Sequence, residues 1–179
     1  MSWRGAQTHL DRMLGLAHLG GVGIITRDRD SGEVRVGKDG EPTVQDAVSE
    51  RDRSHMRQGI AGAARILEAA GATSMFTGHQ AGITWNRDSG EPVERFLTRA
   101  DAAGYDPGRC AMAALHIMGT ARMGGSPETS ATDPDGATWE VGKPRSGRRL
   151  IVPCVVGVNP MVSVEAMGVM NARRLAARL

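Results

Sequence analysis

A histidine at the start of a glycine-rich segment is the feature of this sequence best suited to chemistry. The segment HIMGTARMGGSPETSATDPDG runs from His116 to Gly136 and is dense in small and polar residues. An imidazole beside an apolar stretch can act as a general base, and glycines let the backbone approach a ligand closely. Taken by themselves, these residues fit a structural histidine better than a base.

A second polar group lies immediately before the last helix that the sequence predicts. Asn159 is a favoured N-cap residue, Pro160 is a favoured first-turn residue, and together they open a helix over residues 160–178. The free N–H groups of such a helix start can hold developing negative charge. The first half of this helix, MVSVEAMGVM, is apolar on nearly every side, so we expect it to be buried by more than one neighbour.

Short strands must help to position these groups. Residues 22–48 contain alternating β-branched residues and two turn signals, at 30–32 and 38–40, which indicate a β-meander with one buried face. Residues 72–85 are expected to form a strand or an extended loop, and residues 149–152 a short strand.

Two further helices complete the expected elements. One is predicted over residues 50–70, where Ser49 and Asp52 resemble a capping box and Gly71 provides the stop. The second falls within residues 90–104. Because a strand-rich segment is followed by helices, we expect an α+β fold with an antiparallel sheet and packed helices, rather than a parallel βαβ array.

Composition excludes several classes of function. The 179 residues are 40% hydrophobic and only 3% aromatic, with a net charge of +2, so neither a basic patch nor a stacking surface for nucleic acid is expected. The two cysteines, Cys110 and Cys154, form no metal motif and do not indicate a disulfide. Asp11, Arg12 and His18 interrupt the N-terminal apolar residues, so we expect no signal peptide, no membrane span and a cytoplasmic location.

Two motifs together resemble the C-terminal signature of the glucose–methanol–choline (GMC) flavoprotein oxidoreductases. They are the segment from His116 to Gly136 and the segment GVNPMVSVEAMG around Asn159. Upstream, TRDRDSGEV and ILEAAGA are similar to the corresponding parts of long-chain alcohol oxidases. The resemblance covers most of the chain. It implies an α+β substrate-side domain whose last helix packs on a flavin domain.

The same resemblance implies roles for individual residues. His116 would remove the hydroxyl proton of a small-molecule alcohol as general base while a hydride passes to FAD. Asn159 would be the second polar group of the active site. The helix start at Asn159, Pro160 and Met161 would lie against the flavin, where helix N–H groups stabilise negative charge.

The sequence also departs from the family pattern. No GxGxxG fingerprint is present, so the Rossmann half that grips FAD is absent, and residues 1–115 and 116–179 are expected to form one incomplete C-terminal unit. Ala121 replaces a family cysteine, and an aspartate-containing segment is missing between Val152 and Pro153.

Two functional hypotheses therefore stand. In the first, the chain is the C-terminal part of an FAD-dependent alcohol oxidoreductase and is active only with a flavin-binding domain, supplied by another chain or by a longer reading frame. In the second, it is a non-catalytic remnant or interaction module of the same fold, with exposed apolar surface that favours self-association.

Overall fold

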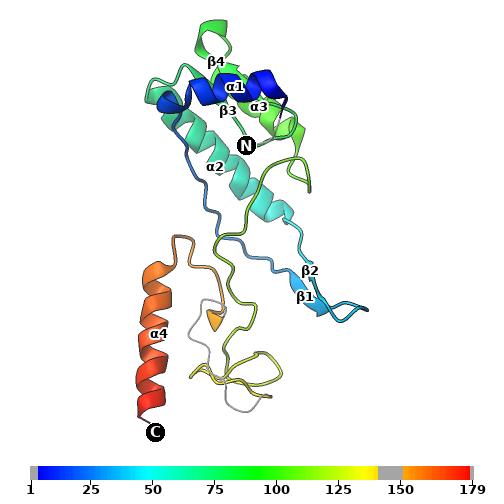
Figure 1. Cartoon of the computed structure of the whole chain (residues 1–179), viewed down its shortest axis with the longest axis vertical. Coiled ribbons are helices and arrows are strands. Elements are labelled where there is room, and N and C mark those ends of the chain that lie inside the picture. Colours follow the sequence, from blue (N-terminus) through cyan, green and yellow to red (C-terminus); the bar gives the residue numbers. More distant parts are fainter. Residues whose placement is uncertain (1–3, 141–150, 178–179) are drawn as a thin grey trace. The chain divides into compact units, whose positions relative to one another are not determined.

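The structure is a computed structural model that describes residues 4–140 and 151–177 (Figure 1). The chain divides into two compact units, one of Met1–Thr26 and Ala47–Ala113 and the other of Arg27–Asp46 and Ala114–Leu179. We call them unit 1 and unit 2. The expected division into residues 1–115 and 116–179 stays a prediction.

Helix α2, Glu50–Ala69, is the longest element of unit 1 and has both of its predicted ends. The Asp52 N–H donates to Ser49 Oγ over 3.2 Å, and Ser49 Oγ donates to the Asp52 carboxylate over 2.9 Å. At the other end Gly71 has a φ of +88°, and the N–H of Ala72 reaches the carbonyl of Leu67 over 3.0 Å. These are the bonds of a Schellman motif, which a glycine at this position favours.

Helix α3 and a hairpin pack with α2 to form the core of unit 1. Helix α3 spans Val93–Ala103, and strands β3, Ser74–Phe76, and β4, Thr84–Asn86, pair antiparallel. The expected strand or loop at residues 72–85 is therefore most of a hairpin. Its inward residues alternate with exposed ones, and the buried cluster consists of Ala64, Met75, Trp85, Val93 and Phe96.

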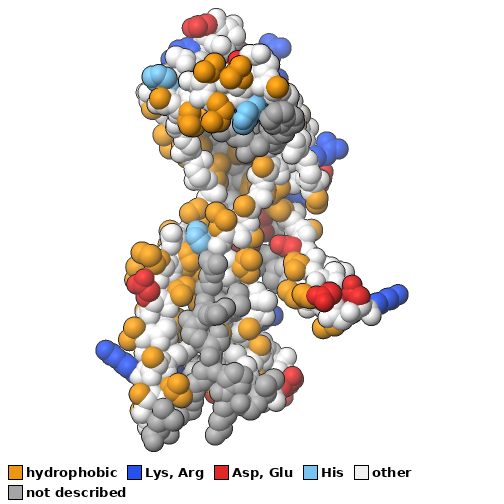
Figure 2. All heavy atoms as spheres, viewed as in Figure 1, with side chains coloured by type: hydrophobic (Ala, Val, Ile, Leu, Met, Phe, Trp, Pro, Cys, Tyr) orange, Lys and Arg blue, Asp and Glu red, His pale blue; other side chains and the backbone are white. Residues whose placement is uncertain are grey.

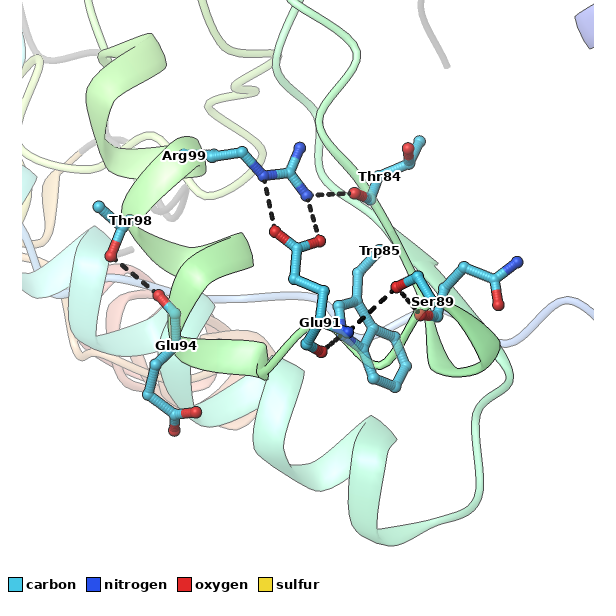
Figure 3. Close-up of polar contacts among 8 residues, drawn as sticks. Thr84, Trp85, Ser89, Glu91, Glu94, Thr98 and Arg99 are labelled. Atoms are coloured by element: carbon cyan, nitrogen blue, oxygen red, sulfur yellow. Dashed lines mark hydrogen bonds and ion pairs between the residues drawn. The ribbon is translucent and has the colours of Figure 1, made fainter.

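Polar contacts around Glu91 attach α3 to strand β4 (Figure 3). The Arg99 guanidinium donates two bonds to the Glu91 carboxylate, over 3.1 and 2.8 Å, and a third to the carbonyl of Thr84 over 2.7 Å. The indole N–H of Trp85 donates to the carbonyl of Glu91 over 2.7 Å. A planar guanidinium suits this bidentate pairing, and the buried indole keeps a partner.

Helix α1, Ala6–Leu14, and a short 3-10 helix, Leu16–His18, precede these elements in unit 1. No periodicity or capping signal in the sequence predicted these two helices. The Arg12 guanidinium lies 4.5 Å from the centre of the Phe76 ring. Such a cation–π contact is favourable and joins α1 to the β3–β4 hairpin.

Unit 2 begins with a second antiparallel hairpin. Strands β1, Glu33–Val36, and β2, Pro42–Gln45, pair so that Val34 faces Val44. The predicted turn at 38–40 is present, with Gly40 at a φ of +83°, but residues 4–32 contain no strand. The expected meander is thus a two-stranded hairpin, and its expected buried face is wrong for this chain, because every residue of both strands is exposed.

The chain closes with helix α4, Met161–Ala176. The fold class is therefore α+β as predicted, and the strands of the described residues form two separate two-stranded antiparallel sheets. Ile151 and Val152 are not in a strand, and the rest of the expected strand at 149–152 lies outside the described residues. Over residues 4–140 and 151–177, no helix combines the length and the apolar character needed to cross a bilayer. The cytoplasmic location stays a prediction.

The two cysteines differ in exposure. Cys110 and Cys154 are both free, Cys110 partly buried and Cys154 exposed. Burial raises the pKa of the Cys110 thiol.

His79 is the most enclosed ionisable group among the described residues of unit 1, although no motif in the sequence singles it out. Its side chain is 1% exposed, its Nδ1 lies 2.8 Å from Thr77 Oγ1, and its ring packs edge-on against Tyr105. Its Nε2 is buried with no hydrogen-bond partner among the described residues. Burial lowers the pKa of His79, and the charge of Asp101 opposes this effect only in part.

The lowered pKa of His79 predicts that acid destabilises unit 1. Below a pH of about 6.5 the unfolded chain binds a proton that folded His79 resists, so stability falls by up to about 1.4 kcal/mol per pH unit for this group. Urea unfolding between neutral and mildly acidic pH should show this slope, and His79→Gln should flatten it. The exposed-site variant His18→Gln should keep it. An equal slope in His79→Gln would assign the acid sensitivity to other groups.

Candidate active site

The glycine-rich segment after His116 is a folded loop in unit 2. Thr132 lies at its centre, 1% exposed, and bridges backbone near Met123 on one side and Thr138 on the other. The Gly124 N–H donates to the carbonyl of Thr132 over 2.9 Å, and the Thr132 N–H donates to that of Arg122 over 3.3 Å. These bonds satisfy backbone groups that a disordered connector would leave to water.

A turn at residues 133–137 closes this loop. The Asp133 carboxylate accepts from the N–H groups of Asp135, over 2.8 Å, and Ala137, over 2.9 Å. The Asp133 N–H also donates to the carbonyl of Ala137 over 2.8 Å. Aspartate commonly stabilises a turn in this way, and Gly136 supplies the positive φ, +78°, that the turn requires.

His116 lies at the entrance of the loop. Its side chain is partly buried, and no hydrogen bond or ion pair joins it to another described residue. The residues on either side, Leu115 and Ile117, are 71% and 50% exposed. Gly119, at a φ of +75°, packs so closely that a Cβ there would lie 3.3 Å from the carbonyl oxygen of Pro153. His116 is thus only partly buried and has exposed apolar neighbours in sequence.

Asn159 lies just before helix α4, and its carboxamide has a fixed orientation. Its Oδ1 accepts from the Met161 N–H over 3.0 Å, so its Nδ2 is left as a donor. The helix starts one residue later than predicted, because Pro160 is the N-cap residue and its carbonyl accepts the first helical bond, from Val164. Asn159 still caps the helix start, but from one position further out.

The start of α4 and the residue Val158 before it expose apolar side chains, and no residue in the first half of the helix is fully buried, contrary to the expected burial. Val158, Met161 and Val162 are 64%, 62% and 72% exposed, and hydrophobic side chains lie along the surface of this helix (Figure 2). The N–H groups of Val162 and Ser163 have no acceptor within the helix, as is usual for a first turn. An apolar surface beside free N–H donors suits a partner that is itself apolar with polar edges.

All four residues singled out by the sequence, His116, Asn159, Pro160 and Met161, lie in unit 2. No hydrogen bond joins His116 to Asn159 among the described residues. Pro160 is buried, whereas Asn159 and Met161 are exposed. Within the described part of the chain, no three His, Cys, Asp or Glu side chains gather in a way that could hold a metal ion.

One interaction that the sequence did not predict joins helix α4 to the loop that begins at His116. Arg174, in the last turn of α4, forms an ion pair with Asp135 in the 133–137 turn, with 2.7 Å between Nη1 and Oδ1. The only signal in the sequence was the basic end of the predicted helix, which suits its dipole wherever the helix lies.

Comparison with known proteins decides the family. A family model described as GMC oxidoreductase, C-terminal part, matches residues 28–168, which include the loop after His116 and the helix start at Asn159. The chain belongs to the GMC oxidoreductases. The predicted resemblance is therefore confirmed.

Relatives of this GMC chain are long-chain-alcohol oxidases of Arabidopsis thaliana. Long-chain-alcohol oxidase FAO4A is 29% identical over 167 residues, which cover 92% of this chain and 22% of the relative. FAO4B is 30% identical over 87% of this chain and 21% of its own length, and FAO3 is 28% identical over 97% and 24%. The chain thus spans less than a quarter of the length of these curated relatives.

Two adjacent glycines test the packing of the GMC loop. A Cβ on Gly124 would lie 2.7 Å from the Cβ of Ser130, whereas a Cβ on Gly125 would meet nothing within 4 Å. We expect Gly124→Ala to lower the free energy of unfolding by about 1–3 kcal/mol through overpacking, and Gly125→Ala to change it by less than about 0.5 kcal/mol. Urea unfolding of both variants measures this difference. Equal stabilities would show that the loop is looser than its hydrogen bonds indicate.

Proposed function

We propose that this chain is the C-terminal, substrate-side part of an FAD-dependent alcohol oxidoreductase and that it acts with a flavin-binding domain. One observation carries the proposal. The family match spans both motifs, and unit 2 leaves the His116 imidazole and the Asn159 Nδ2 available to a ligand. In alcohol oxidation, a general base can remove the hydroxyl proton and a neutral hydrogen-bond donor can stabilise the charge that develops on the oxygen.

The residues at the start of α4 fit one edge of a flavin ring. Val158, Met161 and Val162 offer exposed apolar surface, and the N–H groups of Val162 and Ser163 are free to donate to a carbonyl. The sequence contains no glycine-rich fingerprint for the diphosphate. The flavin-binding domain would therefore supply most contacts to FAD, and this chain would cover its ring.

The proposed chemistry divides between two side chains. The His116 imidazole takes the proton of the alcohol hydroxyl. The Asn159 Nδ2 donates to the same oxygen, and this bond strengthens as negative charge develops there. Because Oδ1 is held by the Met161 N–H, Asn159 presents its donor without reorganisation. When bound, the flavin supplies the acceptor for the hydride of the alcohol carbon.

The neighbours of His116 favour a hydrophobic alcohol as substrate. Leu115 and Ile117 are both largely exposed and flank the proposed base. Exposed aliphatic side chains beside a polar group can bind the alkyl chain of an alcohol while the hydroxyl meets the base. The names of the relatives, long-chain-alcohol oxidases, agree with a substrate of this class.

A non-catalytic interaction module is the second candidate. The exposed apolar residues of unit 2 favour it, since Val36, Val44 and Val162 are each at least 70% exposed. In that case the chain would associate with itself or another protein and would not need His116 or Asn159.

Flavin reduction in the presence of a flavin domain tests the role of His116. The chain is co-expressed with the flavin-binding part of a GMC relative, and FAD absorbance is followed after anaerobic addition of a long-chain primary alcohol. We expect His116→Gln to slow reduction by about 10²–10⁴-fold with FAD still bound, the usual contribution of a general base. The control His18→Gln, at an exposed position of unit 1, should leave the rate unchanged. If the unmodified chain binds no FAD and no reduction occurs, the interaction module is the better description.

Substitution of Asn159 by aspartate separates capping from catalysis. Asn159→Asp keeps an oxygen that accepts from the Met161 N–H but replaces the Nδ2 donor by a second acceptor. We expect unchanged or slightly raised thermal stability, since a carboxylate is favourable at a helix start, and flavin reduction slowed by about 10²–10³-fold. Loss of stability with an unchanged reduction rate would reverse the interpretation and make Asn159 purely structural.

A further inference from the structure

Arg174, in the last turn of helix α4, contacts the turn at residues 133–137 within unit 2. Its Nη1 lies 2.7 Å from Asp135 Oδ1 and donates to the carbonyl of Pro134 over 3.2 Å. Both acceptors belong to the turn that Asp133 organises, so one side chain of α4 holds that turn at two points. Arginine suits such a contact, because its several donors have a fixed geometry.

The acceptor side of this contact is already ordered. Two backbone N–H groups bond to the Asp133 carboxylate, so the turn does not have to fold around Arg174. From the turn, backbone pairing passes through Thr132 to Met123, whose N–H donates to the carbonyl of the fully buried Ile151 over 2.8 Å. Arg174 therefore contacts a turn that is itself hydrogen-bonded to the rest of the loop.

Arg174, which donates these bonds, belongs to helix α4, and Asn159 lies just before the opposite end of this helix. Met161 and Arg174 stand in the first and last turns of one uninterrupted helix, about 20 Å apart at 1.5 Å per residue (Figure 1). At the first turn, buried Pro160 and the Asn159–Met161 bond fix the helix start. Because the helix is about 20 Å long, a small rotation about the end at Arg174 moves the other end, next to Asn159, by several ångströms.

We infer that Arg174 and Asp135 are positioning residues, whose ion pair sets the orientation of α4, with Asn159 at its start, relative to the loop that begins at His116. The catalytic consequence rests on the proposed function. The inference about the orientation of α4 does not depend on the proposed function. Removing the pair leaves each element folded, because the helix has its own hydrogen bonds and the turn has Asp133.

Distance measurements between the two elements test the inference in the full 179-residue chain. Spin labels are placed at two exposed positions, Glu128→Cys in the loop and Glu165→Cys on α4, with Cys110 and Cys154 changed to serine. Double electron–electron resonance spectroscopy then gives the distribution of distances between the two labels. We expect Arg174→Gln to broaden this distribution roughly twofold, since glutamine lacks the charge-assisted bond.

Two variants provide the controls. Arg173→Gln removes the neighbouring charge of the same helical turn and should leave the distribution narrow. The exchange Arg174→Glu with Asp135→Arg restores an ion pair and should narrow it again, which loss of a merely local contact would not predict. An unchanged distribution in Arg174→Gln, or no recovery in the exchange variant, would overturn the inference.

Flavin reduction provides the second measurement. With the flavin-binding domain present, Arg174→Gln should lower kcat about tenfold with little effect on KM, as expected when a catalytic group is misplaced but binding is kept. If no variant reduces flavin, the proposed function fails while the label distances still decide the positioning role.

Discussion

The carboxylate of Asp133 organises the turn on which the rest of unit 2 depends. By accepting two backbone N–H groups it fixes the carbonyl of Pro134 and the side chain of Asp135 as acceptors for Arg174. The glycine-rich loop on one side and helix α4 on the other are thereby connected through a few polar bonds rather than a large apolar core. Such bonds are directional, so they determine orientation more strongly than they add stability.

The weakness of the apolar core in unit 2 follows from where its hydrophobic residues lie. In unit 1, Met75, Trp85 and Phe96 are buried against one another. In the described part of unit 2, Ile151 is the one large hydrophobic residue that is buried, whereas the side chains of Val36, Val44 and Val162 are exposed. A chain that places so much apolar surface outward gains little from burial on folding alone, and a partner that covers this surface would add to its stability.

Local signals in the sequence predicted the elements that depend on local bonds. Ser49, Asp52 and Gly71 define the two ends of α2, and each acts through neighbours within a few residues. The hairpin turn at Gly40 and the end of α3 at Gly104 are of the same kind. The extent of the sheets was less accessible, because alternation in residues 22–32 indicates a strand only if another strand is present to pair with it.

The sequence by itself determined the family of this chain, its α+β class and the identity of the two side chains proposed to act on an alcohol. These depend on residue types and spacing, which the chain carries wherever it folds. Only the tertiary structure decided that Asn159 presents Nδ2 rather than Oδ1, that His79 is enclosed, and that Arg174 joins α4 to the turn at Asp135. Each is a contact whose partner or surroundings are fixed by the folded backbone, and for the Arg174 pair 39 positions separate the two residues, so no periodicity or motif could indicate it.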